Sequence, residues 1–185
     1  MRKSITAIWK GWNGESREYL TLGESGENIT AESLIISSDG GGRPFAARYR
    51  IECDAGWRVR SVSVDLVGEG RGIHLRRDGD GTWHDGSVKL SGLKGAIDVD
   101  IFPTPFTNMI PIRRLGLGAG QSADITAAYI TLPDMSVTSD PQRYTCIEPF
   151  KLYRFESLDS DFKCDVEVDG DGLVVSYPGL FRRVR

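Results

Sequence analysis

The sequence predicts a mainly β protein built as one domain over residues 1–185. Three observations support this fold class: apolar and polar residues alternate with a period of two, Asp-Gly turn signals separate the alternating stretches, and no segment carries a helical apolar face longer than about two turns. With 39% hydrophobic and 26% charged residues, the composition is that of a globular protein. A chain of 185 residues is long enough to bury ~70% of its unfolded surface.

The alternation is clearest in four stretches, at residues 5–9, 45–53, 123–129 and 164–168. In each, apolar residues occupy every second position, with mostly polar or charged residues between them. Successive side chains of a strand point to opposite faces of the sheet, so this pattern is typical of antiparallel strands with one face in water. We expect these four stretches to be strands.

One further stretch, 57–66, changes phase. Its apolar positions are odd-numbered up to Val59 and even-numbered from Val62 onward. An extra residue near Arg60 and Ser61 would keep both sets on the same face, and such a β-bulge also bends and twists a sheet.

The motif Asp-Gly-Asp-Gly occurs twice, at 78–81 and 169–172, each time between two strand-like runs. Glycine readily adopts positive φ, so both motifs predict tight hairpin turns. A calcium-binding loop that began at Asp78 would need glycine at its sixth position and glutamate at its twelfth. Trp83 and Lys89 stand there, which argues against calcium.

Charge and cysteine content narrow the possible partners. The net charge of −3 and pI near 5.5 give no reason to expect nucleic-acid binding. Cys53, Cys146 and Cys164 are far apart and form no Cys-x-x-Cys pair, which fits a reducing compartment. The two histidines complete no metal-ligand cluster, so we expect neither metal nor cofactor. The apolar run at 5–9 is too short for a signal peptide, and no stretch is long enough to span a membrane, so we expect a soluble cytoplasmic protein.

The segment from Asp98 to Leu115 breaks the strand pattern. Pro103 and Pro105 cannot continue a central strand, so the strand at 97–102 must end there. A short helix is expected within 104–110, with its first turn capped by a threonine, after which Pro111 ends the excursion and the following "IRRLGL" resumes as a strand. A second short helix is expected at 14–19.

Asp98 and Asp100 are the most suggestive polar pair. Two residues apart on a strand, they project to one face, where two carboxylates could share a proton or bind a metal ion. Alternatively they accept hydrogen bonds from nearby backbone or pair with Arg113 or Arg114. No Gly-x-Ser-x-Gly nucleophile motif is present.

Three stretches carry a family resemblance: "LSGLKGAIDVDIFPTPFTNMIPIRRLGLGAG" at 90–120, "YRFES" at 153–157 and "VDGDGLVVSYPGLFRRV" at 168–184. Together they resemble the bacterial family called "Putative glycolipid-binding". The sequence departs from the family pattern in having Ala96 in place of a cysteine, and Glu18-Tyr19 in place of Glu-His.

The resemblance implies a strongly curled antiparallel sheet, a spiral β-roll with only short helical turns. It also implies that the concave face holds an apolar ligand such as a glycolipid or another lipid. On this hypothesis two arginines contact the head group, four polar residues shape the mouth and four aromatic residues line the site. They are, in that order, Arg113 and Arg114; Asp98, Asp100, Thr107 and Asn108; and Trp9, Trp57, Phe106 and Tyr129.

Three alternatives stay open. The Pro-Phe-Thr-Asn segment could be architectural, closing one end of the roll with Arg113 or Arg114 buried against the aspartates. The protein could be an enzyme that acts on a small polar substrate through Asp98, Asp100 and the arginines. It could also be a structural subunit that assembles through an exposed sheet edge.

Overall fold

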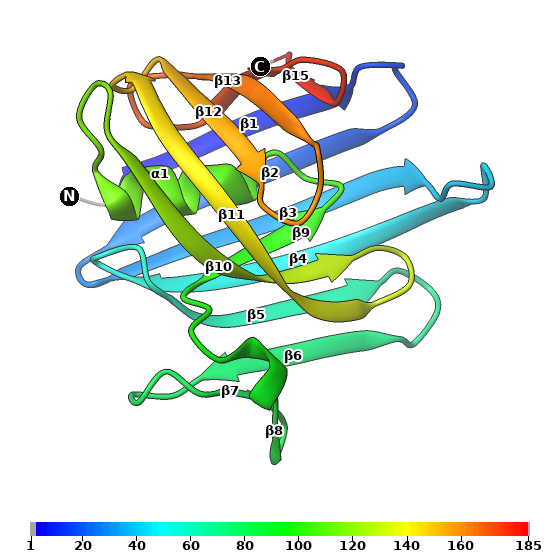
Figure 1. Cartoon of the computed structure of the whole chain (residues 1–185). Coiled ribbons are helices and arrows are strands. Elements are labelled where there is room, and N and C mark those ends of the chain that lie inside the picture. The colour runs from blue at the N-terminus through cyan, green and yellow to red at the C-terminus, as the bar shows by residue number, and fades with distance from the viewer. Residues whose placement is uncertain (1–2, 185) are drawn as a thin grey trace.

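Fifteen strands of the protein form one continuous sheet that does not close (Figure 1). The computed structural model describes residues 3–184. The strands of the first half are β1 (Lys3–Gly11), β2 (Arg17–Ser25), β3 (Asn28–Ser38), β4 (Pro44–Asp54), β5 (Val59–Leu66), β6 (Gly72–Arg77), β7 (Trp83–Asp85) and β8 (Val88–Lys89). Those of the second half are β9 (Asp98–Phe102), β10 (Ser122–Thr131), β11 (Ser136–Glu148), β12 (Leu152–Ser157), β13 (Lys163–Val168), β14 (Val174–Tyr177) and β15 (Phe181–Arg183).

The strand order runs from β8 back to β1, then from β15 back to β9. The first and last strands therefore meet in the middle of the sheet, where Trp9 of β1 lies opposite Arg183 of β15. In Figure 1 the strands β10–β12 cross in front of β1–β4, so the sheet curls back over itself. The predicted mainly β, strongly curled sheet is confirmed.

One strand pair differs from the antiparallel expectation. β9 runs parallel to β10, with Asp98 opposite Ala127. A parallel pair needs a long crossover connection, and residues 103–121 provide it with a helix.

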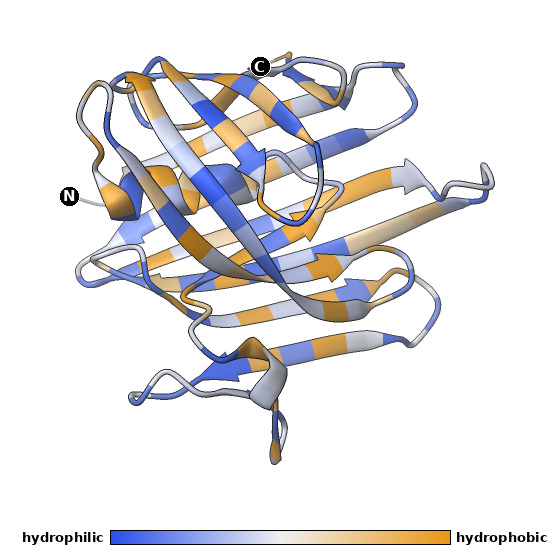
Figure 2. Ribbon diagram, in the orientation of Figure 1, coloured by the Kyte–Doolittle hydropathy of each residue, from blue (hydrophilic) through white to orange (hydrophobic). Residues whose placement is uncertain are grey.

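The expected alternation and bulge are present. Along β4, every second side chain from Phe45 to Cys53 is buried, and the same banding of apolar and polar residues is visible in Figure 2. Glu52 lies opposite Ser61 and Cys53 lies opposite Val59, which leaves Arg60 as the extra residue of a β-bulge.

Both Asp-Gly-Asp-Gly motifs form hairpin turns. The first connects β6 and β7, and the second connects β13 and β14. In the second, the Gly172 amide donates to the Asp169 carbonyl at 2.8 Å, and Gly172 has φ +88°. Side chains other than glycine rarely adopt this backbone conformation.

The segment after β9 contains more helix than expected. A 3-10 turn, η2 (Phe106–Asn108), continues directly into the helix α1 (Met109–Leu115), which ends at Gly116 in the left-handed conformation. The expectation that Pro111 ends the helical segment and that a strand follows is wrong. Pro111 lies in the first turn of α1, where backbone N–H groups have no partner within the helix, so its missing donor costs little.

Two shorter segments also differ from the prediction. A short 3-10 turn, η1 (Ser91–Leu93), precedes β9. The helix expected at 14–19 is wrong, because β2 begins at Arg17 and its alternating burial matches strand geometry.

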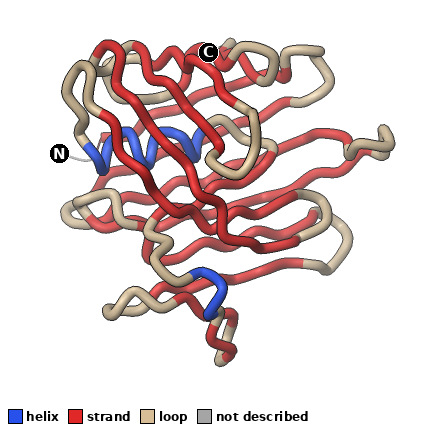
Figure 3. The backbone as a smooth tube through the Cα atoms, viewed as in Figure 1, coloured by secondary structure: helices blue, strands red, loops and turns tan. Residues whose placement is uncertain are grey.

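The helix α1 lies inside the curl, between the two layers of strands (Figure 3). Met109 and Ile110 pack into a core cluster with the inner faces of β1–β6, and Ile112 packs into a second cluster with β10–β15. Side chains of the described residues therefore fill much of the interior of the curled sheet.

Candidate functional site

A pocket of about 460 Å³ opens on the inner side of the second half of the sheet. Its walls come from β9 and the segment after it, from β10–β12, β14 and β15, and from the turns that follow β12 and β14. One part of the wall is apolar and mainly aromatic: Phe102, Phe155, Phe162, Tyr177, Leu180 and Phe181. Another part is polar: Asp100, Asn108, Tyr129, Asp140, Ser157 and Asp159.

Two carboxylates of the pocket are tied to one buried amide. The Gln142 Nε2 group donates to Asp100 Oδ2 at 2.8 Å and to Asp140 Oδ2 at 2.6 Å. Thr107 Oγ1 donates to the other oxygen of Asp100 at 2.7 Å. Burial raises the pKa of Asp100 and the pKa of Asp140 above the ordinary value of an aspartate. The amide therefore holds two carboxylates close together in a weakly solvated place.

Two tyrosines of the pocket have hydroxyl groups without a hydrogen-bond partner among residues 3–184, Tyr129 and Tyr177. Burial, followed by the charge of Asp100, raises the pKa of Tyr129 to about 12 and raises that of Tyr177 strongly. Both groups therefore stay protonated at neutral pH. Tyr177 is only 5% exposed as a residue, but neither tyrosine hydroxyl is among the fully buried unpaired atoms, so both oxygens reach the pocket, where a ligand can pair with them.

The rings of Phe155, Phe162 and Tyr177 form the aromatic wall. Their centroids are 6.0 to 6.4 Å apart, and none of the three pairs is parallel. Phe162 is 42% exposed, so the wall continues from the buried Phe155 out to the rim of the pocket.

The two arginines predicted to contact a head group lie elsewhere. Arg114 forms a two-pronged ion pair with Asp98, with Nε 2.9 Å from Oδ1, and the Asp98 side chain is 1% exposed. Burial raises the pKa of Asp98, and the Arg114 guanidinium opposes that shift. Arg113 lies over the ring of Trp57, 5.2 Å from its centroid, and donates to the Asp171 carbonyl. Arg114 therefore matches the architectural alternative, in which one arginine is buried against an aspartate.

The remaining predicted residues divide between pocket and core. The residues that line the pocket are Asp100, Asn108 and Tyr129. Thr107 does not line it but donates a hydrogen bond to Asp100. Trp9 is fully buried and donates from Nε1 to the Val174 carbonyl at 2.7 Å.

The other aromatic candidates also lie in the core. Phe106 is 1% exposed and stacks on Tyr49, and Trp57 is 5% exposed beneath Arg113. Aromatic residues at inward-facing positions fill the interior of a curled sheet as readily as they line a cavity, which is why the sequence pattern did not separate the two roles.

A buried glutamate, Glu18 of β2, was not among the predicted residues. It is 4% exposed, and its Oε1 accepts hydrogen bonds from Tyr49 at 2.6 Å and Ser33 at 2.8 Å, while Oε2 has no partner among residues 3–184. Burial raises the pKa of Glu18 to about 7. The Tyr49 hydroxyl lies 3.5 Å from Thr104 Oγ1, which lines the pocket. Glu18 shares the face of β2 that holds Leu20, and that alternation was the available signal.

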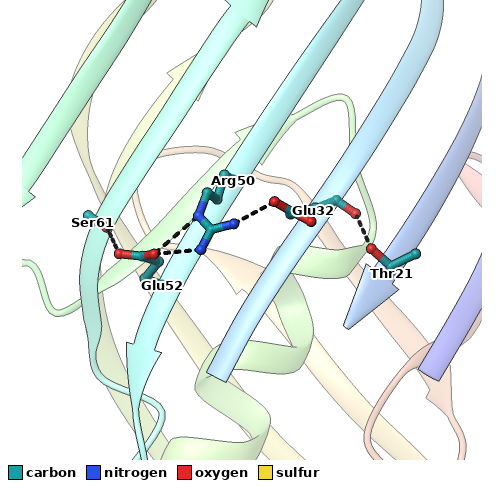
Figure 4. A network of polar contacts seen from close by, with 5 residues as sticks. All are labelled: Thr21, Glu32, Arg50, Glu52 and Ser61. Carbon is teal, nitrogen blue, oxygen red and sulfur yellow. Dashed lines mark hydrogen bonds and ion pairs between the residues drawn. The ribbon is translucent and has the colours of Figure 1, made fainter. Parts of the chain in front are cut away.

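The outer face of the sheet carries a different kind of polar network (Figure 4). Arg50 bridges Glu32 and Glu52 across strands β3 and β4, and Glu52 accepts from Ser61 of β5. All three charged side chains are about half exposed, so the ion pairs stabilise the fold only slightly.

Comparison with known proteins agrees with this architecture. A family model described as "Putative glycolipid-binding" matches residues 6–183. The chain belongs to this family. The crystal structure of a DUF1089 family protein from Pseudomonas aeruginosa is similar over 92% of each chain, with 40% sequence identity and a TM-score of 0.82. Comparison with curated proteins gives no match. Within residues 3–184, no helix has the length and apolar character needed to cross a bilayer.

Proposed function

We propose that the protein binds a glycolipid or a similar amphiphile in the pocket between β9–β12 and β14. One observation carries the proposal: an aromatic wall stands beside a polar wall, and two tyrosine hydroxyls, Tyr177 of the first wall and Tyr129 of the second, have no described partner. An amphiphile has both kinds of surface. Its alkyl part would pack against Phe155 and Phe162, and its head group would form hydrogen bonds with the hydroxyls of Tyr129 and Tyr177.

The size of the pocket suits this use. Binding pockets for small molecules are commonly about 300–1,000 Å³, and the volume here is about 460 Å³. A second hollow of about 570 Å³ shares Phe102, Leu180 and Phe181 with the first, so a ligand too long for one has an adjacent place to continue. Each methylene group that leaves water contributes about 0.8 kcal/mol, so even a short alkyl segment gives useful affinity.

The proposal revises where the ligand lies. The resemblance placed it on the concave face as a whole, but helix α1 and the core clusters occupy most of that face. The pocket retains part of it, the inner side of β10–β12. The enzyme alternative has weaker support, since Asp98, one of its two aspartates, is bound by Arg114 and does not line the pocket.

The test is native purification of the full chain, extraction with organic solvent and mass spectrometry of the extract. Ser157 lines the pocket, and Ser157→Trp is designed to fill it. Ser63→Trp on the outer face of β5 is the matched control. We expect an amphiphile in the extracts of wild type and Ser63→Trp and a loss of at least tenfold in Ser157→Trp. Equal amounts from all three folded proteins, or no amphiphile from wild type together with no binding of added amphiphile, would refute the proposal.

A further inference from the structure

The charged residues that line the pocket all have the same sign. They are Asp100, Asp140 and Asp159, and no described lysine or arginine is part of the lining. The adjoining hollow repeats this pattern with Glu15, Asp39 and Asp134. The whole chain, by contrast, is nearly balanced, with 23 basic and 26 acidic residues. The acidic lining is therefore a local feature of this side of the molecule.

Among the described side chains, no lysine or arginine forms an ion pair with Asp100 or Asp140. Arg114 is bound to Asp98, and Arg143 forms an exposed two-pronged pair with Asp124. Asp100 and Asp140 instead share the neutral amide of Gln142. Two carboxylates that lie close together without a cation repel each other, and a bound positive charge would stabilise both.

The two unpartnered hydroxyls point to the same kind of ligand. Tyr177 is only 5% exposed, and its hydroxyl has no hydrogen-bond partner among residues 3–184. Burial, followed by the charge of Asp100, raises the pKa of both Tyr129 and Tyr177, so both hydroxyls lie within the electrostatic reach of that carboxylate. An ammonium group bound to Asp100 can donate to tyrosine oxygens with its remaining N–H groups.

The aromatic wall adds a second attraction for a cation. Phe155, Phe162 and Tyr177 line the same pocket as the carboxylates, with their rings inclined to one another. A cation within about 6 Å of a ring centroid is attracted to the ring face, and the attraction is larger where water is excluded. Carboxylates together with several ring faces are a recurrent way to hold an amine.

We propose that the ligand of this pocket is a cationic amphiphile, whose ammonium group binds Asp100 and Asp140 from the pocket side, beside the Gln142 amide that links them, and whose alkyl chain follows the aromatic wall. This inference rests on the proposed function, and it specifies the head group. A phosphate or sulfate head group would meet three carboxylates without a lysine or arginine, so the pocket selects against anionic lipids. Arg113 and Arg114, which were predicted from the sequence to contact the head group, do not line the pocket and supply no positive charge there.

The experiment compares three probes with the same ten-carbon chain below their micelle concentrations: decylammonium, decyl glucoside and decyl phosphate. The full chain, freed of co-purified lipid, is titrated with each by isothermal calorimetry at two salt concentrations. We expect decylammonium to bind about tenfold or more tightly than decyl glucoside, decyl phosphate to bind most weakly, and the preference for decylammonium to shrink at high salt.

Two variants locate the effect. Asp140→Asn removes one carboxylate charge of the pocket and should weaken decylammonium about tenfold while changing decyl glucoside little. Asp165→Asn on β13 is the control, because Asp165 is exposed, pairs with Arg154 and does not line the pocket. Thermal unfolding followed by circular dichroism checks that both variants fold. Should Asp140→Asn fail to fold, Asp159→Asn takes its place.

The outcomes separate the two proposals. Glucoside or phosphate binding as tightly as decylammonium overturns the cationic ligand and leaves amphiphile binding in place. An unchanged decylammonium affinity in a folded pocket variant also overturns it. If none of the three probes binds, the proposed function fails and the inference fails with it.

Discussion

Replacement of Glu18 by glutamine tests whether a titrating carboxyl group lies buried with Ser33 and Tyr49 in the core. Glu18 Oε1 accepts from Tyr49 and Ser33, and Oε2 has no described partner. A glutamine keeps the accepting oxygen and places an NH₂ group where Oε2 lies, without a charge. The substitution therefore removes one titration from the core and leaves the packing unchanged.

The magnitude follows from the pKa. Burial raises the pKa of Glu18 from 4.5 to about 7 in the folded protein. A glutamate whose pKa is raised by folding contributes stability in full below its unfolded pKa, and that contribution is lost as pH rises through the folded pKa. Across the whole range the loss is about 3 kcal/mol, with most of it between pH 5 and pH 8.

The assay is urea unfolding of wild type and Glu18→Gln at pH 5 and at pH 8. Other carboxylates titrate too, so the informative quantity is the difference between the two proteins. We expect that difference to move by about 2–3 kcal/mol in favour of Glu18→Gln between the two pH values. Glu27→Gln, in the exposed turn after β2, is the control and should show no such change. Parallel pH profiles for wild type and Glu18→Gln would refute the reasoning.

Three further predictions concern an ion pair, a turn and a hydroxyl. Arg114→Met leaves Asp98 buried without its partner and should cost roughly 3–5 kcal/mol in urea unfolding, partly recovered by adding Asp98→Asn; a cost under about 1 kcal/mol would contradict the buried pair. Gly172→Ala should cost roughly 1–2 kcal/mol because of its φ of +88°, whereas Gly170→Ala, without positive φ, should cost less; equal costs would contradict the turn assignment. Tyr129→Phe should weaken decylammonium binding severalfold and change stability by less than about 0.5 kcal/mol, and the reverse pattern would mean that the hydroxyl is structural.

The sequence predicted those parts of the fold that depend on local pattern. Alternation identified β4, the phase change at Arg60 identified a bulge, and the Asp-Gly motifs identified two hairpins. The helix α1 was only partly predicted, because Pro111 was interpreted as a helix terminator. A proline in the first turn is compatible with a helix, and burial of Ile112 favours continuing it.

The pocket could not be predicted in the same way. Asp100, Tyr129, Asp140, Phe155 and Tyr177 come from five different strands and meet only because the sheet curls. The Asp98–Arg114 pair was among the alternatives, since both lie in one short segment that reverses direction. Which of the two arginines pairs with Asp98 depends on how residues are placed around the helix α1. The sequence predicted an end to that helix at Pro111, which left the choice between Arg113 and Arg114 open.

The central claim is that the pocket beside Asp100 binds an amphiphile, and a crystal structure of the protein soaked with decylammonium tests it most directly. We predict density for an alkyl chain along Phe155 and Phe162, with the nitrogen within hydrogen-bond distance of Asp100 or Asp140. Density for the probe only on another surface, with the pocket left to water, would contradict the account.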